Sequence, residues 1–366
     1  MKASSLKDEI AIESRVAELK SANQRLLLQL SQAKAKTADL VAAVYQASRD
    51  AAMTLDIPPV KAPKPDKRTH TAETAIALVS DLQLGKRTPT YNTKVCEERM
   101  VRYAEKIISL IEIQRSHHPV RRLMVPVLGD IIEGAADIFP GQQHLVDSSL
   151  YRQLTVDGPR IMVTFLRTLL TAVDSIEVEW IIGNHGRLGR KGEHDPETNG
   201  DRMLGKIVET ILSLIEEPRV TFHEPKIALL PSDDEPEARV RFNVPDGAHE
   251  RNWYSIARVG KYSALCIHGD QIKGHSGFPW YGLGKKVNGW AAGAIPEAFT
   301  DVFMGHWHQI ASIPLNKRTV YVNGSTESYN TYAQENLAAM SDPAQWLLFA
   351  HPERGIITAE YKVWLS

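Results

Sequence analysis

The sequence predicts an α/β protein, because short apolar runs alternate with longer segments of helical periodicity. Five of the apolar runs end directly in polar side chains that can bind a metal ion. Continuous apolar runs of this length are typical of strands buried on both faces, and open α/β sheets place their sites just beyond the carboxyl ends of such strands. We therefore expect the five strand ends to meet at one place.

The five predicted strands and the polar residues after them can be given in chain order. They are 75–79 before Asp81, 123–128 before Gly129 and Asp130, 178–182 before Asn184 and His185, 263–267 before His268 and Asp270, and 302–304 before His306 and His308. Two histidines one residue apart beyond a buried strand can serve two neighbouring metal ions. Asp, Asn and His side chains together suit a pair of first-row divalent ions.

Helices are expected between these strands, at residues 93–117, 150–173 and 202–215. Residues 224–252 are acidic and contain prolines, which indicates an excursion from the core. Apolar runs at 320–322, 346–350 and 356–363 predict closing strands.

The amino-terminal segment has a heptad pattern over residues 12–47, without Gly or Pro, which favours a coiled coil. Asn23 at an a position favours a parallel homodimer through residues 1–55. The alternative is a helix packed on its own catalytic domain, since Ala and Thr also occupy the seam. Four prolines among basic residues then indicate a semi-rigid linker. The predicted domains are 1–55 helical, 56–70 linker and 71–366 catalytic.

Composition restricts the class of protein. The 366 residues are 43% hydrophobic, and no apolar stretch reaches the ~20 residues that span a bilayer. The amino terminus lacks the apolar core of a secretory signal, so we expect a cytoplasmic protein without a membrane partner. Cys96 and Cys266 cannot form a disulfide framework. The net charge of −1 indicates no general affinity for polyanions, so any such site must be local.

The polar strand ends suit hydrolysis at phosphorus. Two ions roughly 3.5–4 Å apart can clamp a phosphoryl oxygen and supply a hydroxide nucleophile. His185 directly follows Asn184 and is not expected to face the same ion. It therefore suits a general acid, or a group that stabilises charge in the transition state.

The ordered motifs resemble the calcineurin-like metallophosphoesterase superfamily over residues 72–350. They are Asp81-x-Gln83, Gly129-Asp130, Gly183-Asn184-His185-Gly186, His268-Gly269-Asp270 and Gly305-His306-Trp307-His308. Within it, extended forms of the last three, together with 322–325, are similar to phage-borne members likened to DNA repair exonucleases. A phage-encoded protein would act in the host cytoplasm.

The resemblance implies a fold and a site. The fold is a two-sheet sandwich flanked by helices, here with an amino-terminal helical coiled-coil extension. One metal would be held by Asp81, the residue at 83 and His308, and a second by Asn184, His268 and His306, with Asp130 bridging and His185 catalytic. The sequence departs from the pattern at Gln83, where the family has histidine.

Cations and aromatic residues near the motifs predict contacts to a nucleic-acid strand, by phosphate contact and base stacking. The substrate-binding candidates are Arg187, Lys273, Lys285 and Lys286, with Lys86, Arg87, Arg190, Lys191, Trp280, Tyr281 and Trp290 as further candidates. His144 is a weaker one, whereas His117, His118, His194 and His351 are interpreted as exposed histidines without a role.

We therefore expect a divalent-metal-dependent phosphodiester hydrolase, and specifically a DNA-directed nuclease. Its cofactors would be two divalent ions, Mn²⁺ first, with Mg²⁺, Fe²⁺ or Zn²⁺ as alternatives. A phosphomonoesterase, a small-nucleotide phosphodiesterase and a non-catalytic scaffold remain as rival hypotheses, and an ATPase partner remains open.

Overall fold

The computed structural model describes residues 59–366 with gaps, and seven residues before them. The gaps are 65, 67, 136–137, 195, 217–238, 245–252, 275–277 and 338–339. The chain divides into two units, Met1–Ala47 and Ser48–Ser366. In the first unit Lys20, Gln24, Arg25, Asp39, Ala42, Ala43 and Gln46 are helical. Most of the heptad segment lies outside the described residues, so the coiled coil and its dimer stay predictions.

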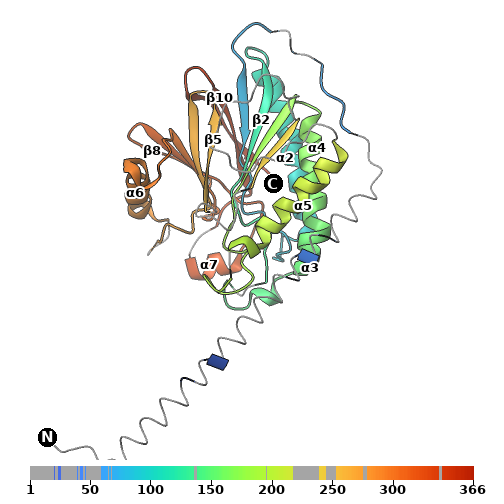
Figure 1. Cartoon of the computed structure of the whole chain (residues 1–366), viewed down its shortest axis with the longest axis vertical. Coiled ribbons are helices and arrows are strands. Elements are labelled where there is room, and N and C mark those ends of the chain that lie inside the picture. The colour runs from blue at the N-terminus through green and yellow to red at the C-terminus, as the bar shows by residue number, and fades with distance from the viewer. Residues whose placement is uncertain are drawn as a thin grey trace, which may run out of the picture. The chain divides into compact units, whose positions relative to one another are not determined.

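The second unit contains two β-sheets (Figure 1). The six-stranded sheet has the order β11-β10-β1-β2-β3-β4, in which β1 to β4 are parallel and β10 is antiparallel to both its neighbours. The strands are β1 Glu73–Ala77, β2 Val120–Val127, β3 Ser175–Trp180, β4 Val240–Asn243, β10 Ala344–His351 and β11 Ile356–Trp364. Since parallel neighbours share one direction, the segments after β1, β2 and β3 leave the sheet at the same edge.

The second sheet has five strands in the order β5-β6-β7-β9-β8. Here β6, β7 and β9 are parallel, and β5 and β8 are antiparallel edge strands. The strands are β5 Tyr254–Val259, β6 Tyr262–Ile267, β7 Asp301–Met304, β8 Ala311–Leu315 and β9 Arg318–Val322. The strands predicted from apolar runs are thus all present, whereas the partly polar β4, β5 and β8 were not predicted.

The two sheets pack against each other through a shared apolar core. Ile76 and Met124 from the first sheet and Cys266 and Phe303 from the second belong to the same buried cluster. Continuous apolar runs are required here, because the other faces of these strands are also covered. Cys96 and Cys266 are both buried and unpaired with each other, as expected.

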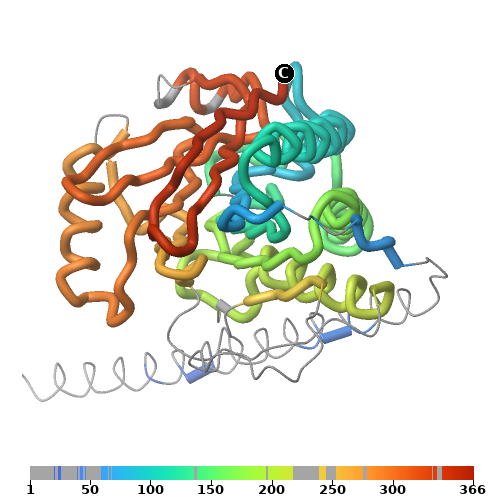
Figure 2. The backbone as a smooth tube through the Cα atoms, turned by 90° about the horizontal axis from the view of Figure 1, so that it is seen from above, coloured from blue at the N-terminus to red at the C-terminus, as the bar shows by residue number. Residues whose placement is uncertain are grey.

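Helices cover the outer faces of both sheets (Figures 1 and 2). Beside the six-stranded sheet lie α2 Thr93–Gln114, α3 Leu150–Arg152, α4 Gly158–Leu170 and α5 Gly200–Ile215. The predicted helix 150–173 contains a π-helical segment, η2 Gln153–Asp157, between α3 and α4. On the outer face of the other sheet lies α6 Trp280–Gly289, which continues into η4 Trp290–Ala294 and buries Leu283 and Val287 against β6 and β7 residues.

The remaining described elements are short. They are η1 Gln142–His144, η3 Pro196–Thr198 and α7 Thr331–Leu337. The resulting layers are helices, sheet, sheet and helix, which is the two-sheet sandwich flanked by helices that the motifs predicted. Among the described residues, no helix combines the length and apolar character needed to span a membrane.

Candidate metal centre

The predicted metal ligands lie in loops whose backbone is unusual. Five of them have left-handed backbone dihedrals: φ is 51° at Asp81, 49° at Gln83, 53° at Asp130, 72° at His306 and 53° at His308. Residues other than glycine rarely adopt positive φ, and such positions gather at functional sites where the surrounding structure imposes them. The sharp turns at these strand ends therefore serve the placement of side chains.

A buried carboxylate holds two of these loops in place. Asp201, in the first turn of α5, accepts hydrogen bonds from the backbone N–H of Asp130 at 2.8 Å and of Gly183 at 2.9 Å. It also accepts from Ile131 at 3.0 Å and Ile132 at 3.2 Å. Burial and the charge of Asp130 raise the Asp201 pKa to about 6, against the N–H donors. No sequence motif indicated this residue, although Asn199 directly before α5 is a residue type that commonly caps a helix, and Asp201 lies in the first turn.

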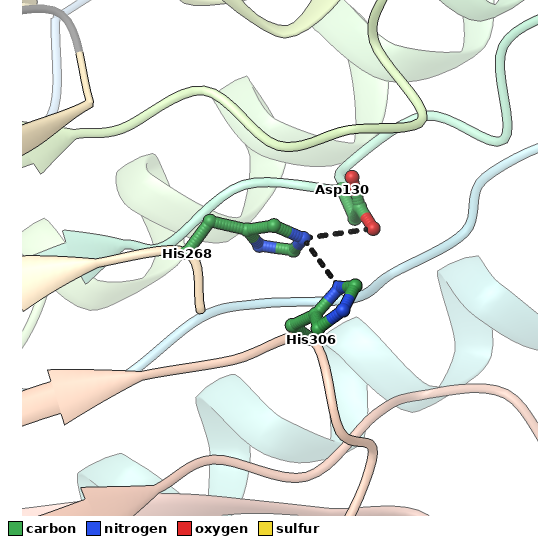
Figure 3. A group of neighbouring side chains, drawn as sticks. All are labelled: Asp130, His268 and His306. Carbon is green, nitrogen blue, oxygen red and sulfur yellow. Dashed lines mark hydrogen bonds and ion pairs between the residues drawn. The ribbon is translucent and has the colours of Figure 1, made fainter. Parts of the chain in front are cut away.

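One part of the centre gathers around His268, and we call it the His268 half (Figure 3). The His268 Nε2 atom lies 3.0 Å from Asp130 Oδ2, 3.0 Å from Asn184 Oδ1 and 3.2 Å from His306 Nδ1. The imidazole Nδ1 lies 2.7 Å from the Leu128 carbonyl oxygen, to which it donates. Because that bond fixes the tautomer, Nε2 is left as the atom facing the ligands.

The pKa values of the ionisable groups in the His268 half are strongly shifted, because these groups are buried close to one another. Burial opposes charge on His268, but Asp130 outweighs it and raises the His268 pKa to about 10. Burial and the neighbouring His268 charge lower the His306 pKa to about 4. Burial favours neutral Asp130, yet the charges on His268 and His185 hold its pKa well below the usual range.

The other part, the His308 half, contains Asp81, Gln83 and His308. The His308 Nε2 atom lies 3.3 Å from Asp81 Oδ1. The Gln83 Nε2 atom lies 3.5 Å from both Asp130 Oδ2 and His308 Nε2, so the side chain does face the centre. Gln83 Oε1 is buried without a hydrogen-bond partner. Rotating the amide by 180° would exchange the two atoms and present an oxygen ligand.

A buried ion pair orients His308 from behind. Glu327 Oε1 lies 2.9 Å from His308 Nδ1, and Glu327 Oε2 lies 2.6 Å from Lys86 Nζ. Burial raises the Glu327 pKa, but Lys86 and His308 lower it far more, so the carboxylate is ionised. Lys86 is only 2% exposed. The interpretation of Lys86 as a substrate contact was therefore wrong, because its ammonium group neutralises Glu327 inside the protein.

His185 lies beside the ligands, without occupying a ligand position of its own. Its backbone N–H donates to Asp130 Oδ1 at 2.8 Å, and its ring Nε2 lies 4.0 Å from Asp130 Oδ2. On the other side, Nδ1 lies 3.2 Å from the Glu133 carbonyl oxygen and 3.4 Å from Glu133 Oε2. Burial lowers the His185 pKa, but Asp130 and Glu133 more than offset this and raise it.

The donor set fits divalent ions. The donor atoms of Asp130, His268 and His306 all lie within 4.8 Å of one another. Imidazole nitrogens, carboxylates and carboxamides are ligands of first-row divalent metals. Gln83 Oε1 is one of the buried polar atoms without a hydrogen-bond partner, and the rotated amide would turn it toward the centre, where an ion would satisfy it. The structure therefore brings all seven predicted ligand positions, and His185, into one cluster.

The residues predicted to contact substrate differ in exposure and in whether they are already paired with a carboxylate. Lys273, Lys285 and Lys286 are exposed. Arg187 is held by Asp270, 2.6 Å from its Oδ2, and Lys191 lies 3.5 Å from the same atom. Trp290 is only 7% exposed and packs in the core under α6, so its proposed stacking role was wrong.

Exposed aromatic side chains do lie beside the centre. Trp280 is 64% and Tyr281 85% exposed at the start of α6. The Phe278 ring lies 4.7 Å from that of Trp280 and 5.6 Å from that of Trp307, between the two motif histidines. The exposed ring of Trp280 is thus connected through Phe278 to the ligand loop, and the exposed Tyr281 follows it in the chain.

Comparisons with known proteins are limited to distant structures. No family model and no curated protein matches the sequence. An archaeal phosphodiesterase is 11% identical, with 79% of this chain and 99% of the other covered and a TM-score of 0.32. Zinc-bound Vps29 from Entamoeba histolytica is 8% identical, with 80% and 99% covered and a TM-score of 0.32. A predicted phosphoesterase from Streptococcus pneumoniae is 13% identical, with 80% and 99% covered and a TM-score of 0.28.

At such identities the likeness concerns the fold alone, and TM-scores below 0.5 make it weak. What the chain does must therefore be inferred from its own residues.

Proposed function

We propose that this chain is a divalent-metal-dependent phosphodiester hydrolase and that its substrate is DNA. The observation that supports this most is the convergence of carboxylate, carboxamide and imidazole donors from five strand ends around Asp130. A mixed donor set of this kind serves hydrolysis by metal-activated water.

The ligands divide between two ions in this proposal. Asp81, Gln83 and His308 would hold one ion, and Asn184, His268 and His306 the other. Asp130 would be shared, since its Oδ2 faces both His268 and Gln83. Bound ions would supply an activated water and neutralise charge on the phosphoryl oxygens. The combination of nitrogen and oxygen donors is compatible with Mn²⁺, which we propose as the working metal.

His185 would act on the substrate directly. Glu133 engages the Nδ1 side of the ring, so the Nε2 side, 4.0 Å from Asp130 Oδ2, is the side that would face a phosphate ester. The carboxylates of Asp130 and Glu133 favour the protonated ring, which can donate a proton to the leaving oxygen or stabilise charge on the phosphoryl group.

A strand-binding surface supports a polymeric substrate over a small phosphate ester. Trp280 and Tyr281 expose flat rings that can stack on bases, and Phe278 connects Trp280 to Trp307 in the ligand loop. Lys285 and Lys286 are exposed on the same short helix. Stacking rings with neighbouring cations suit an extended single strand.

The test compares substrates with purified full-length protein and Mn²⁺. We expect a higher kcat/KM on single-stranded DNA than on an aryl phosphate monoester, with duplex DNA and RNA measured alongside. Trp280→Ala, and Lys285→Ala combined with Lys286→Ala, should lower activity on DNA while leaving a small chromogenic diester unaffected. Lys317→Ala is the matched control, since this exposed lysine lies in the β8–β9 turn at the far end of the sheet.

If the protein prefers the monoester and these variants do not change that preference, the proposal is wrong and the protein is a phosphomonoesterase. If the protein prefers RNA, phosphodiester hydrolysis stands as the proposed reaction, but DNA as the proposed substrate is wrong. No hydrolysis of any phosphate ester, despite stoichiometric metal binding, would favour the scaffold hypothesis.

A further inference from the structure

One exposed tyrosine shares the unusual backbone of the metal ligands. Among the described residues other than glycine, seven have left-handed backbone dihedrals, and five of these are the ligands described above. The sixth, Asn316, lies in the β8–β9 turn, and asparagine is one of the residue types that tolerate this conformation. The seventh is Tyr329, with a φ of 57°. A bulky side chain rarely adopts this conformation, so the backbone of Tyr329 needs another explanation.

The segment that leads to Tyr329 runs along the His308 half of the centre. Ser325 Oγ donates to the Asp81 carbonyl oxygen at 2.6 Å, which ties this segment to the first ligand loop. Glu327 comes two residues later and orients His308. Tyr329 follows after two more residues, so its Cα atom lies within about 7.6 Å of that of Glu327.

Hydrogen bonds on both sides impose the turn at Tyr329. The Ser328 carbonyl oxygen accepts from Thr88 Oγ1 at 2.7 Å. The Asn330 Nδ2 atom donates at 2.6 Å to Glu327 Oε1, the same oxygen that orients the ligand histidine. Strained residues persist where the surrounding structure determines their backbone, and they gather at functional sites. The fixed neighbours therefore hold Tyr329 beside the metal centre.

The Tyr329 side chain gains little burial from this conformation. It is 44% exposed, so packing of the ring inside the protein does not explain the strain. An exposed flat ring next to a site for a phosphodiester is suited to stack on a neighbouring base. Stacking uses the face of the base, which is accessible when the base is unpaired.

We propose that Tyr329 is a specificity-determining residue, whose ring stacks on an unpaired nucleobase next to the phosphodiester at the metal centre. The inference rests on the proposed function and narrows its substrate class to a strand with unpaired bases at the cleavage position. Trp280 would stack on a base at another position. It is connected to the centre through Phe278 and Trp307, whereas Tyr329 is connected through Glu327.

The test measures binding of a fluorescent single-stranded oligonucleotide and of an abasic strand with the same backbone. The parent is the full-length protein with His185→Ala and Mn²⁺, so that the strand is cut slowly. Loss of one stacked base predicts that adding Tyr329→Ala raises the dissociation constant for the base-bearing strand by about 5- to 150-fold. The affinity for the abasic strand should not change. Tyr329→Phe keeps the ring and should bind both strands as the parent does.

Two further variants separate the ring from the backbone strain. Tyr329→Gly relieves the strain, since glycine adopts positive φ freely, and should melt ~2–4 °C above Tyr329→Ala. Both should bind the base-bearing strand equally weakly. Asn316→Ala is the matched control, because it places alanine at a left-handed position in the β8–β9 turn, and its DNA affinity should equal that of the parent.

Equal affinity of the parent and Tyr329→Ala for the base-bearing strand would overturn the proposal, as would absence of binding by the parent. An equal loss on the abasic strand would mean contact with the nucleic-acid backbone, and a loss in Tyr329→Phe would mean a hydrogen bond. Both results contradict stacking. A loss in Asn316→Ala as well would mean a general effect of destabilisation and would also overturn the proposal.

Hydrolysis of the base-bearing strand by the protein that retains His185 is measured separately. Binding that depends on Tyr329 and on the bases, without hydrolysis, would contradict the proposed function alone. Hydrolysis together with no effect of Tyr329→Ala would contradict this inference alone.

Discussion

The two halves of the metal centre differ in their donors and in how those donors are held. In the His268 half, three potential ligands lie 3.0–3.2 Å from one imidazole nitrogen. In the His308 half the corresponding separations are 3.3–3.5 Å, and a carboxamide occupies a position where the superfamily that the motifs resemble has histidine. The first arrangement is more compact and has two imidazoles, whereas the second is wider and has one.

The support behind each histidine differs as well. A backbone carbonyl, that of Leu128, orients His268, and the loops around it are tied to Asp201. A charged side chain, Glu327, orients His308 and depends on Lys86 for neutralisation. The Leu128 carbonyl that orients His268 cannot be removed by a side-chain substitution, but the buried ion pair that orients His308 can be broken by one. We therefore expect that substitutions can adjust the metal affinity of the His308 half gradually, because its support is a side-chain ion pair.

The largest expected effect comes from the His268 half. His268→Ala removes the nitrogen that contacts three other ligands, so we expect activity to fall by ~10³-fold or more, the equivalent of several kcal/mol of metal-assisted stabilisation. Chelation should abolish wild-type turnover, and Mn²⁺ should restore it in wild type alone. Hydrolysis that survives exhaustive chelation would contradict the mechanism.

His185→Ala should separate chemistry from metal binding. Because the His185 ring faces Glu133 and does not occupy a ligand position, we expect a loss of ~10²–10⁴-fold in kcat with both ions retained. Metal content by elemental analysis and single-turnover kinetics measure the two effects. If this variant loses its bound metal instead, His185 is a metal ligand of the His268 half and its proposed role in proton transfer is wrong.

Glu327→Gln should weaken the His308 half alone. Loss of the carboxylate behind His308 should lower affinity for one ion by ~10–100-fold. It also leaves the Lys86 ammonium buried without its partner, which costs ~3–5 kcal/mol of folding free energy. Combining it with Lys86→Met should recover the melting temperature but not the metal affinity. Recovery of both in the double variant would show that Glu327 acts through stability only.

Gln83 gives the smallest expected effect. An imidazole is a stronger ligand than a carboxamide oxygen for Mn²⁺, so Gln83→His should tighten the weaker ion by about ten-fold, or 1.4 kcal/mol. Gln83→Ala should loosen it. Isothermal titration of wild type and both variants with Mn²⁺ measures this affinity. Three identical isotherms would show that Gln83 is not a metal ligand.

Much of the fold was readable from hydrophobic runs, because strands such as 75–79 and 302–304 are covered on both faces and must be continuously apolar. Edge strands such as β4 and β8 were missed, since their exposed faces admit polar residues. For the centre, the sequence by itself determined which side chains stand at strand ends.

Only the tertiary structure decided which groups support them. Asp201, Glu327 and Glu133 belong to no predicted motif, and each acts on a loop that is distant in sequence. Lys86 reads as a surface cation in the sequence but is buried by its pairing with Glu327. The physical reason is that strand-end position follows from local periodicity, whereas burial and charge pairing depend on which distant segments the two sheets bring together.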